Sequence, residues 1–192
     1  MTFRNAAACL ASIAAVGVVH AASFAEPRIT VEHAPAIVVV TRDVAGDYDQ
    51  APRVFGDLMR VAKPYRTAGN VFGIYPVDPD ATTGANELRW QAAIQVVETA
   101  NPGATPALGD LAKPEQPYRL ELLSASTVAV VKSTVARAGA DGLAVIPWMA
   151  RNGYVQIAPT RMEFLRADVP SSQIPVRIVV PIAKRKSGLK AG

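Results

Sequence analysis

The hydrophobic run AIVVVT at residues 36–41 decides the fold, because a second run of the same kind, TVAVVK, occurs at residues 127–132. Short runs rich in Val and Ile are typical of buried β-strands. The segments that follow each run also correspond in order, at separations of roughly 86 to 90 positions. Such a spacing is too long for a solenoid repeat and fits a duplicated half-domain.

After the first run, the pattern predicts a helix and two more strands. Gly46 marks a turn, and Pro52 suits the first turn of a helix, where its missing N–H costs nothing. Apolar residues then recur at helical spacing until Pro64 ends the segment. Strand patterns follow at residues 71–77 and 88–97, and each is closed by a turn signal that contains proline.

The second half repeats this order after a proline-rich joint at residues 101–117. Residues 118–123 predict an additional strand at its start, and residues 161–166 and 176–182 predict the last two strands. Between them, apolar residues at helical spacing over 143–150 predict a helix.

The sequence of this second helix contains a stop signal and a proline. Asn152-Gly153 is a good C-terminal signal. Pro147 falls inside the helical pattern, where it favours a kink or a late start because it removes a backbone hydrogen bond.

Two strand–helix–strand–strand units predict an α+β fold with an antiparallel sheet and helices on one face. Each half is too small to bury its apolar surface alone, so we expect the halves to pair about a pseudo-twofold axis. The domain spans residues 26–182, with halves at about 29–100 and 118–182. Pockets favour junctions between units, so the axis is the natural place for a ligand.

The N-terminus predicts export. Arg4 precedes an uncharged apolar run at residues 6–19, and small residues between Ala21 and Ala25 suit a signal peptidase. Residues 1–25 are therefore interpreted as a cleaved signal peptide, which places the protein in the periplasm or outside the cell. An uncleaved membrane tether is the alternative.

Cleavage would also limit the chemistry of the chain. Cys9 and His20 lie in the signal segment, so His33 is the one histidine left and no cysteine remains. A disulfide, a thiol nucleophile, an iron–sulfur cluster and a multi-histidine zinc site are thereby excluded. We expect no metal and no cofactor. His33 is expected in a polar stretch before the first strand, where a catalytic triad is not favoured.

The charge balance does not indicate nucleic acid as a partner. The chain has a formal net charge of +4, and Lys184, Arg185, Lys186 and Lys190 lie close to the C-terminus. The domain itself is near neutral, so it predicts no phosphate-binding face. Residues 183–192 are interpreted as a disordered basic tail, with weak contact to anionic lipid as the alternative.

Several stretches resemble one known family. FGIYPVDP at residues 72–79 is similar to that family's strand and turn, and ELRWQAAI at 87–94 is similar to the strand that follows. GDY at 46–48, RMEFL at 161–165 and IVVPI at 178–182 resemble further motifs. Together these stretches resemble the GyrI-like effector-binding family, the drug-sensing half of certain transcription regulators, in an exported stand-alone form.

The chain departs from the family pattern at several positions. It has no proline in the turn at residues 46–48, has Phe164 in place of a tyrosine, and has no Asp-Pro after Leu165. It also has no DNA-binding segment.

The resemblance implies a cleft for lipophilic, often cationic, molecules with one glutamate at its base, which by position is Glu163. On a strand, Arg161 and Leu165 share the face of Glu163. The alternative is therefore a structural glutamate that is paired with Arg161.

Aromatic side chains are expected to line the same cleft, because an aromatic face can hold a cation beside a carboxylate. The candidates are Tyr75, Tyr48, Trp90 and Trp148. The alternative is that some of them are ordinary core residues.

The leading functional hypothesis is an exported binder of a hydrophobic small molecule. One alternative is hydrolysis of a reactive electrophile, with Glu163 as general base and Tyr75 polarising the substrate. A second alternative is haem or tetrapyrrole binding, for which His33 is the remaining histidine ligand.

Overall fold

The computed structural model describes residues 27–46, 50–65, 70–75, 89–98, 114–165 and 170–185. The expected signal peptide, Tyr48, the turn expected at residues 78–80 and most of the basic tail lie outside these residues. In the part of the chain that is described, no helix is long and apolar enough to cross a membrane.

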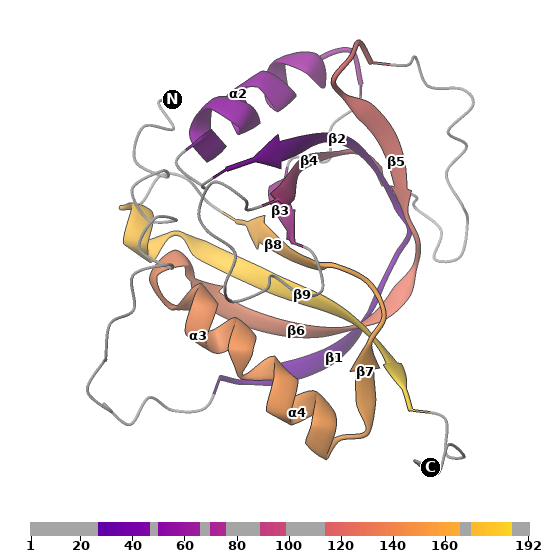
Figure 1. The fold of residues 1–192 in the computed structure, drawn as a ribbon, viewed down its shortest axis with the longest axis vertical. Coiled ribbons are helices and arrows are strands. Elements are labelled where there is room, and N and C mark those ends of the chain that lie inside the picture. Colours follow the sequence, from indigo (N-terminus) through magenta and orange to yellow (C-terminus); the bar gives the residue numbers. More distant parts are fainter. Residues whose placement is uncertain are drawn as a thin grey trace.

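The described elements follow the predicted order closely (Figure 1). The strands are β1 (Ile29–Ala34), β2 (Ile37–Ala45), β3 (Val71–Tyr75), β4 (Arg89–Glu98), β5 (Arg119–Leu123), β6 (Ser126–Thr134), β7 (Tyr154–Gln156), β8 (Thr160–Phe164) and β9 (Pro175–Lys184). The helices are α2 (Ala51–Val61), α3 (Ala138–Leu143) and α4 (Val145–Arg151).

All strand pairs are antiparallel, in the order β1-β6-β9-β8-β3-β4-β2-β5, and β7 pairs with the end of β9. The predicted α+β class, with an antiparallel sheet and helices on one face, is confirmed. From the centre of the sheet outward, the first half has the order β3, β4, β2. The second half has the corresponding order β8, β9, β6. The two central strands, β3 and β8, pair with one another and form the seam between the halves.

The halves exchange their edge strands. β1 is joined to β2 by Pro35 and Ala36 alone, yet it pairs with β6 of the other half. In the same way, β5 leads directly into β6 but pairs with β2. Because two residues span roughly 7 Å at most, strands near opposite ends of the sheet must meet at each link. The sheet therefore curls, as Figure 1 shows where β2 and β5 turn down toward β1 and β6.

The two faces of the curled sheet have different contents. α2, α3 and α4 cover the outer face, and a large apolar cluster that includes Leu58, Val131 and Ile178 fills the space between. The inner face, which carries the alternate residues of each strand, holds two smaller apolar clusters, one around Phe72 and one around Val130.

Two helices contain a proline in their first turn. α2 begins at Ala51, so Pro52 lies in its first turn as predicted. The second helical pattern is two helices that meet at Ala144, and Pro147 lies in the first turn of α4, where its missing N–H is tolerated. The expected break is therefore placed before Pro147.

Two strands were missed. The expectation that His33 precedes the first strand is wrong, because His33 lies within β1. β7 (Tyr154–Gln156) is short, and no strand was predicted from the sequence at these residues.

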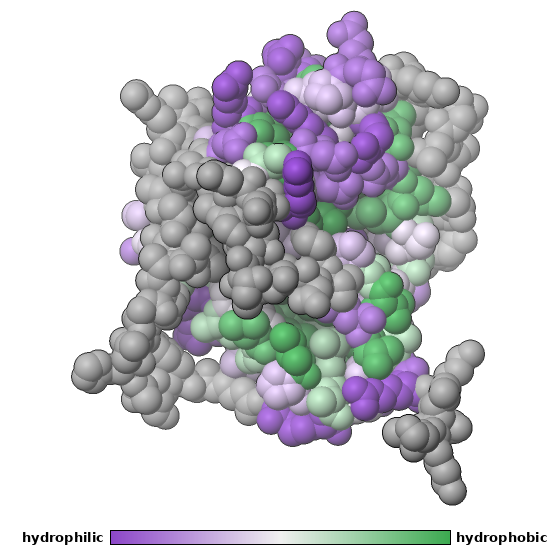
Figure 2. Space-filling view, viewed as in Figure 1, coloured by the Kyte–Doolittle hydropathy of each residue, from purple (hydrophilic) through white to green (hydrophobic). Residues whose placement is uncertain are grey.

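The surface of the two helical regions also differs. Hydrophilic residues gather over α2 at the top of Figure 2, whereas apolar residues are visible near α3 and α4 in the lower part of the view. Leu143 and Ile146 are among the exposed apolar residues there.

Candidate functional site

A cluster of charged side chains lies on the inner face at the seam. Glu163 of β8 accepts a hydrogen bond of 3.0 Å from Arg177 of β9 through Oε2, and its Oε1 lies 3.2 Å from Nε of Arg161. Arg177 also donates a 2.6 Å bond to Glu32 of β1. The register makes Glu163 the cross-strand partner of Arg177. Arg177 reaches diagonally across β6 to Glu32, because Arg177 is level with Lys132 and Glu32 is level with Val128.

The cluster is largely shielded from water. The side chain of Glu163 is 12% exposed and that of Arg161 is 11% exposed. Burial lowers the pKa of the Arg161 guanidinium, and the nearby charge of Glu163 offsets this only in part. Burial also acts to lower the pKa of Arg177, but its bonds to Glu163 and Glu32 outweigh that effect and raise the pKa.

The cluster borders a small hollow of about 230 Å³. Its walls come from β1, β2, β3, β4, β8 and β9 and from Pro35 of the β1–β2 link. The link therefore lies close to the seam strands β3 and β8. The lining residues are His33, Ala34, Pro35, Ile37, Asn70, Phe72, Gln95, Arg161, Glu163 and Arg177.

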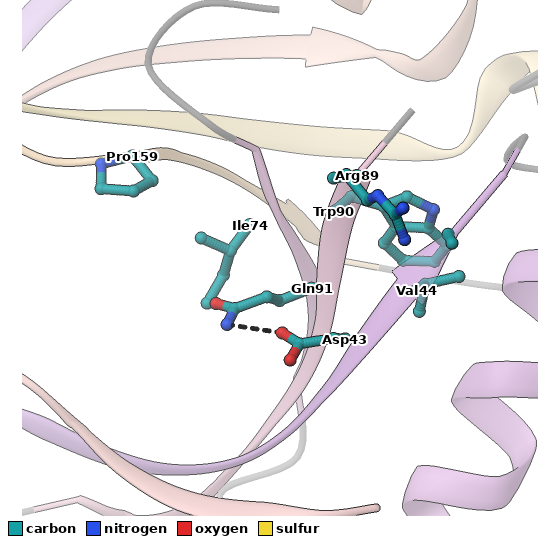
Figure 3. A pocket seen from close by; sticks show the side chains of 8 residues that line it. Asp43, Val44, Ile74, Arg89, Trp90, Gln91 and Pro159 are labelled. Atoms are coloured by element: carbon teal, nitrogen blue, oxygen red, sulfur yellow. Dashed lines mark hydrogen bonds between the residues drawn. The ribbon is translucent and has the colours of Figure 1, made fainter. Parts of the chain in front are cut away.

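A larger hollow of about 510 Å³ lies at the other end of the seam strands (Figure 3). Its walls combine apolar and polar groups from β2, β3, β4 and the segment before β8. Figure 3 shows Ile74, Gln91 and Asp43 facing the open space, with Pro159 across from them. The lining residues are Asp43, Val44, Ala45, Ile74, Arg89, Trp90, Gln91 and Pro159.

The two hollows are neighbours on the inner face. Ile74 of the larger hollow is the cross-strand partner of Arg161, which lines the smaller one. Because antiparallel partners point to the same side of a sheet, the two side chains lie next to each other. A ligand in the smaller hollow therefore lies at the charged cluster. A ligand in the larger hollow lies beside Ile74, the neighbour of that cluster.

A second polar network stands at the larger hollow. Gln91 donates a 2.9 Å hydrogen bond to Asp43, and Arg119 of β5 lies 2.8 Å from the same carboxylate. Thr41 donates to Glu121 at 2.8 Å. The bond from Arg119, with that from Gln91, lowers the pKa of Asp43. In the same way, the bond from Arg177 lowers the pKa of Glu32.

These lowered pKa values predict a loss of stability in acid. The unfolded carboxyls titrate near pH 4, so Glu32 and Asp43 stabilise the fold above about pH 4 and stop doing so as the pH falls through their lower folded values. We expect the free energy of unfolding, measured in urea at pH 6, 5, 4 and 3, to fall. The double variant Glu32→Gln with Asp43→Asn should show a shallower fall. An unchanged slope would mean that neither ion pair persists in solution.

The five residues predicted from the sequence are not all brought together. Glu163 lines the smaller hollow, next to Arg161 as the structural alternative proposed. Trp90 contributes to the wall of the larger hollow but packs mainly in the outer core, with its ring 6.0 Å from that of Phe55. Their assignment as ligand contacts stays a prediction.

The other three predicted residues lie elsewhere or outside the description. Tyr75 alternates with Ile74 and packs on the outer cluster, where its hydroxyl folds back over Gly73. Trp148 of α4 stacks on Tyr154, with 5.6 Å between the ring centroids. Nζ of Lys184 lies 4.0 Å from the centroid of the same Tyr154 ring. Tyr48 lies outside the described residues.

Arg177 and Glu32 belong to the cluster but were not singled out from the sequence. Arg177 interrupts the apolar strand PVRIVVPIAK, and a charged residue in the middle of such a strand is a usable signal. Glu32 carried no such signal, because its strand alternates polar and apolar residues and β1 was not predicted.

No protein-family model matches the sequence, and no curated protein matches it. The structure is similar to the EcmrR C-terminal domain, with a TM-score of 0.63 and 14% identity over 83% of this chain and 99% of that one. It is also similar to an uncharacterised conserved protein of Listeria innocua, with a TM-score of 0.57 and 10% identity over 82% and 93% of the two chains. A hydrolase from Listeria innocua gives a TM-score of 0.52 and 9% identity over the same shares.

These likenesses concern the fold. The chain has the same fold as the EcmrR C-terminal domain, and its membership of the GyrI-like family stays a prediction. Glu163 of the seam strand β8 and its partners Arg161 and Arg177 form a cluster of charged groups beside the junction of the two halves.

Proposed function

We propose that this protein is an exported small-molecule-binding protein whose ligand occupies the inner face of the curled sheet. The supporting observation is the pair of adjoining hollows at the seam, of about 230 and 510 Å³, which share one row of cross-strand neighbours. Ligand pockets of about 300–1,000 Å³ are usual for drug-sized molecules, so the two hollows together suit one such ligand. The apolar side chains of Ile74, Val44 and Pro159 favour a lipophilic body.

The sequence resemblance implies a lipophilic cation held by Glu163. Each oxygen of Glu163 already has a guanidinium within 3.2 Å, from Arg161 and Arg177. A cationic ligand would have to compete with both arginines for that carboxylate. The structure therefore favours binding at this face without making Glu163 the counter-charge.

Hydrolysis has less support from the geometry. Phe72 and Ile74 line the inner hollows, and residues alternate along β3, so Tyr75 lies on the opposite face. Glu163 and Tyr75 are therefore separated by the sheet, and this pair is not assembled for catalysis. For a tetrapyrrole, His33 does line the smaller hollow, but about 230 Å³ is below the usual size even for drug-like ligands.

The two tryptophans provide a direct test. Trp90 lies on the wall of the larger hollow, whereas Trp148 is stacked on Tyr154 beside α4. We expect a bound ten-carbon probe to change the emission of Trp90 in a Trp148→Phe protein, because the probe alters the polarity around its ring. The probes are decanoate, decanol and decyltrimethylammonium, each kept below its micelle concentration.

The matched control is Trp90→Phe, which leaves Trp148 as the reporter. Its emission should stay constant over the same titration. If Trp148 alone responds, the ligand site is not on the inner face. If no probe binds, the proposed function is contradicted.

A further inference from the structure

The charges at the buried end of the cluster do not balance. Arg161 and Arg177 share the single carboxylate of Glu163, and the second carboxylate, Glu32, is bonded to Arg177 and to the hydroxyl of Thr30. Glu32 is also the more exposed of the two carboxylates, at 38% of its side chain. The buried part of the site therefore holds two guanidiniums against one carboxylate.

Arg161 is the group left incomplete. The residue is 9% exposed, and its contact with Glu163 is made through Nε. Its two terminal nitrogens have no polar partner among the residues that the structure describes. Nε itself is buried and makes no hydrogen bond of good geometry among the described residues, and a buried guanidinium donor left unmade is costly.

The surroundings of Arg161 also disfavour a further cation. Arg177 lies on the same face, and its positive charge acts to lower the pKa of Arg161 together with burial. Asn70, Gln95 and His33 supply neutral polar groups around the same hollow. Another positive charge placed here would add repulsion in a region of low dielectric constant.

We propose that the ligand of this site carries an oxyanion, such as a carboxylate, which the terminal nitrogens of Arg161 bind. This inference rests on the proposed function and names the charge of its ligand. The planar fork of a guanidinium matches a carboxylate in a bidentate arrangement, and charge-assisted bonds of this kind are the strong ones. The apolar body of the ligand extends past Ile74, the cross-strand neighbour of Arg161, into the larger hollow.

The test compares the same three ten-carbon probes by isothermal titration calorimetry at pH 7.5. Decanoate, decanol and decyltrimethylammonium have equal chains and differ in the charge of the head group. We expect decanoate to bind about tenfold or more tightly than decanol, since each hydrogen bond to a charged group adds that much. Decyltrimethylammonium should bind more weakly than decanol.

Variants of Arg161 connect the preference to the residue. Arg161→Gln should remove the advantage of decanoate over decanol while changing the affinity for decanol less than about twofold. Arg161→Lys keeps the charge but loses the fork, so it should retain an intermediate preference. The matched control is Arg60→Gln, which removes an exposed arginine of α2 whose partner is Asp57. That variant should bind decanoate as the parent does.

The outcomes separate the two proposals. Binding of decanol and decyltrimethylammonium without any preference for decanoate would overturn the oxyanion site and leave small-molecule binding intact. An unchanged preference in folded Arg161→Gln would also overturn it. Failure of all three probes to bind the parent protein would overturn the proposed function itself. Circular dichroism establishes folding, and Arg161→Lys decides the result if Arg161→Gln does not fold.

Discussion

Replacing Glu163 with glutamine should lower the free energy of unfolding by about 3 kcal/mol, because the change leaves two guanidiniums at the seam with no buried carboxylate between them. Glu163 is 12% exposed and contacts Arg161 at 3.2 Å and Arg177 at 3.0 Å. Glutamine keeps the size of the side chain, so the loss arises from charge and not from packing. Urea denaturation at pH 7 measures it.

The matched control is Glu121→Gln, which makes the same change on the same sheet face. Glu121 also contacts an arginine, Arg119, but its side chain is 30% exposed. Exposed ion pairs contribute about 1 kcal/mol or less, so the control should be close to the parent protein. A double variant, Glu163→Gln with Arg161→Gln, should recover part of the loss since it removes one of the stranded charges. Equal effects of Glu163→Gln and Glu121→Gln would contradict a buried cluster.

Glu163→Gln should also change the affinity for the ligand, and the direction of the change differs between a cationic ligand and an oxyanion. If Glu163 were the counter-charge for a cation, Glu163→Gln would weaken the binding of decyltrimethylammonium. If Arg161 binds an oxyanion, the substitution frees both arginines, and decanoate should bind more tightly. The direction of the change therefore distinguishes the ligands without needing its magnitude.

Much of the fold could be predicted from local patterns. The outer strands of each half are apolar on both faces because both faces are covered, and this produced the two similar runs at β2 and β6. Pro52 fixed the start of α2 through a purely local effect. The exchange of β1 and β5 between halves could not be predicted, because a two-residue link usually indicates a hairpin, and here the partner is distant in sequence.

The candidate site was predictable only in part, for a related reason. Glu163 was found through a motif, and its pairing with Arg161 follows from alternation along one strand. Arg177 reaches Glu163 from the neighbouring strand β9, and Glu32 reaches Arg177 from β1 on the far side of β6, so no local pattern encodes either contact. Tyr75 was placed on the wrong side for catalysis with Glu163 because the strand boundaries alone did not say which alternate residues faced inward.

Phe72 offers the second large effect, because it is both a core residue and a wall of the smaller hollow. It is 1% exposed, it is the cross-strand partner of Glu163, and it packs with Ile37 and Val39. Phe72→Ala should lower the free energy of unfolding by about 3 to 5 kcal/mol, as other buried Phe→Ala changes do. Differential urea denaturation against the parent protein measures this loss.

The vacated volume gives Phe72→Ala a second consequence that an ordinary core variant lacks. The space joins the hollow beside Arg161, so acids with a bulkier body should gain affinity relative to decanoate. The control is Leu58→Ala, because Leu58 is fully buried on α2 in the outer cluster. It should cost similar stability and leave the preference among acids unchanged, since the sheet separates it from the hollow. A shift of ligand preference in both variants would indicate general loosening of the fold, and no shift in either would place the ligand away from Phe72.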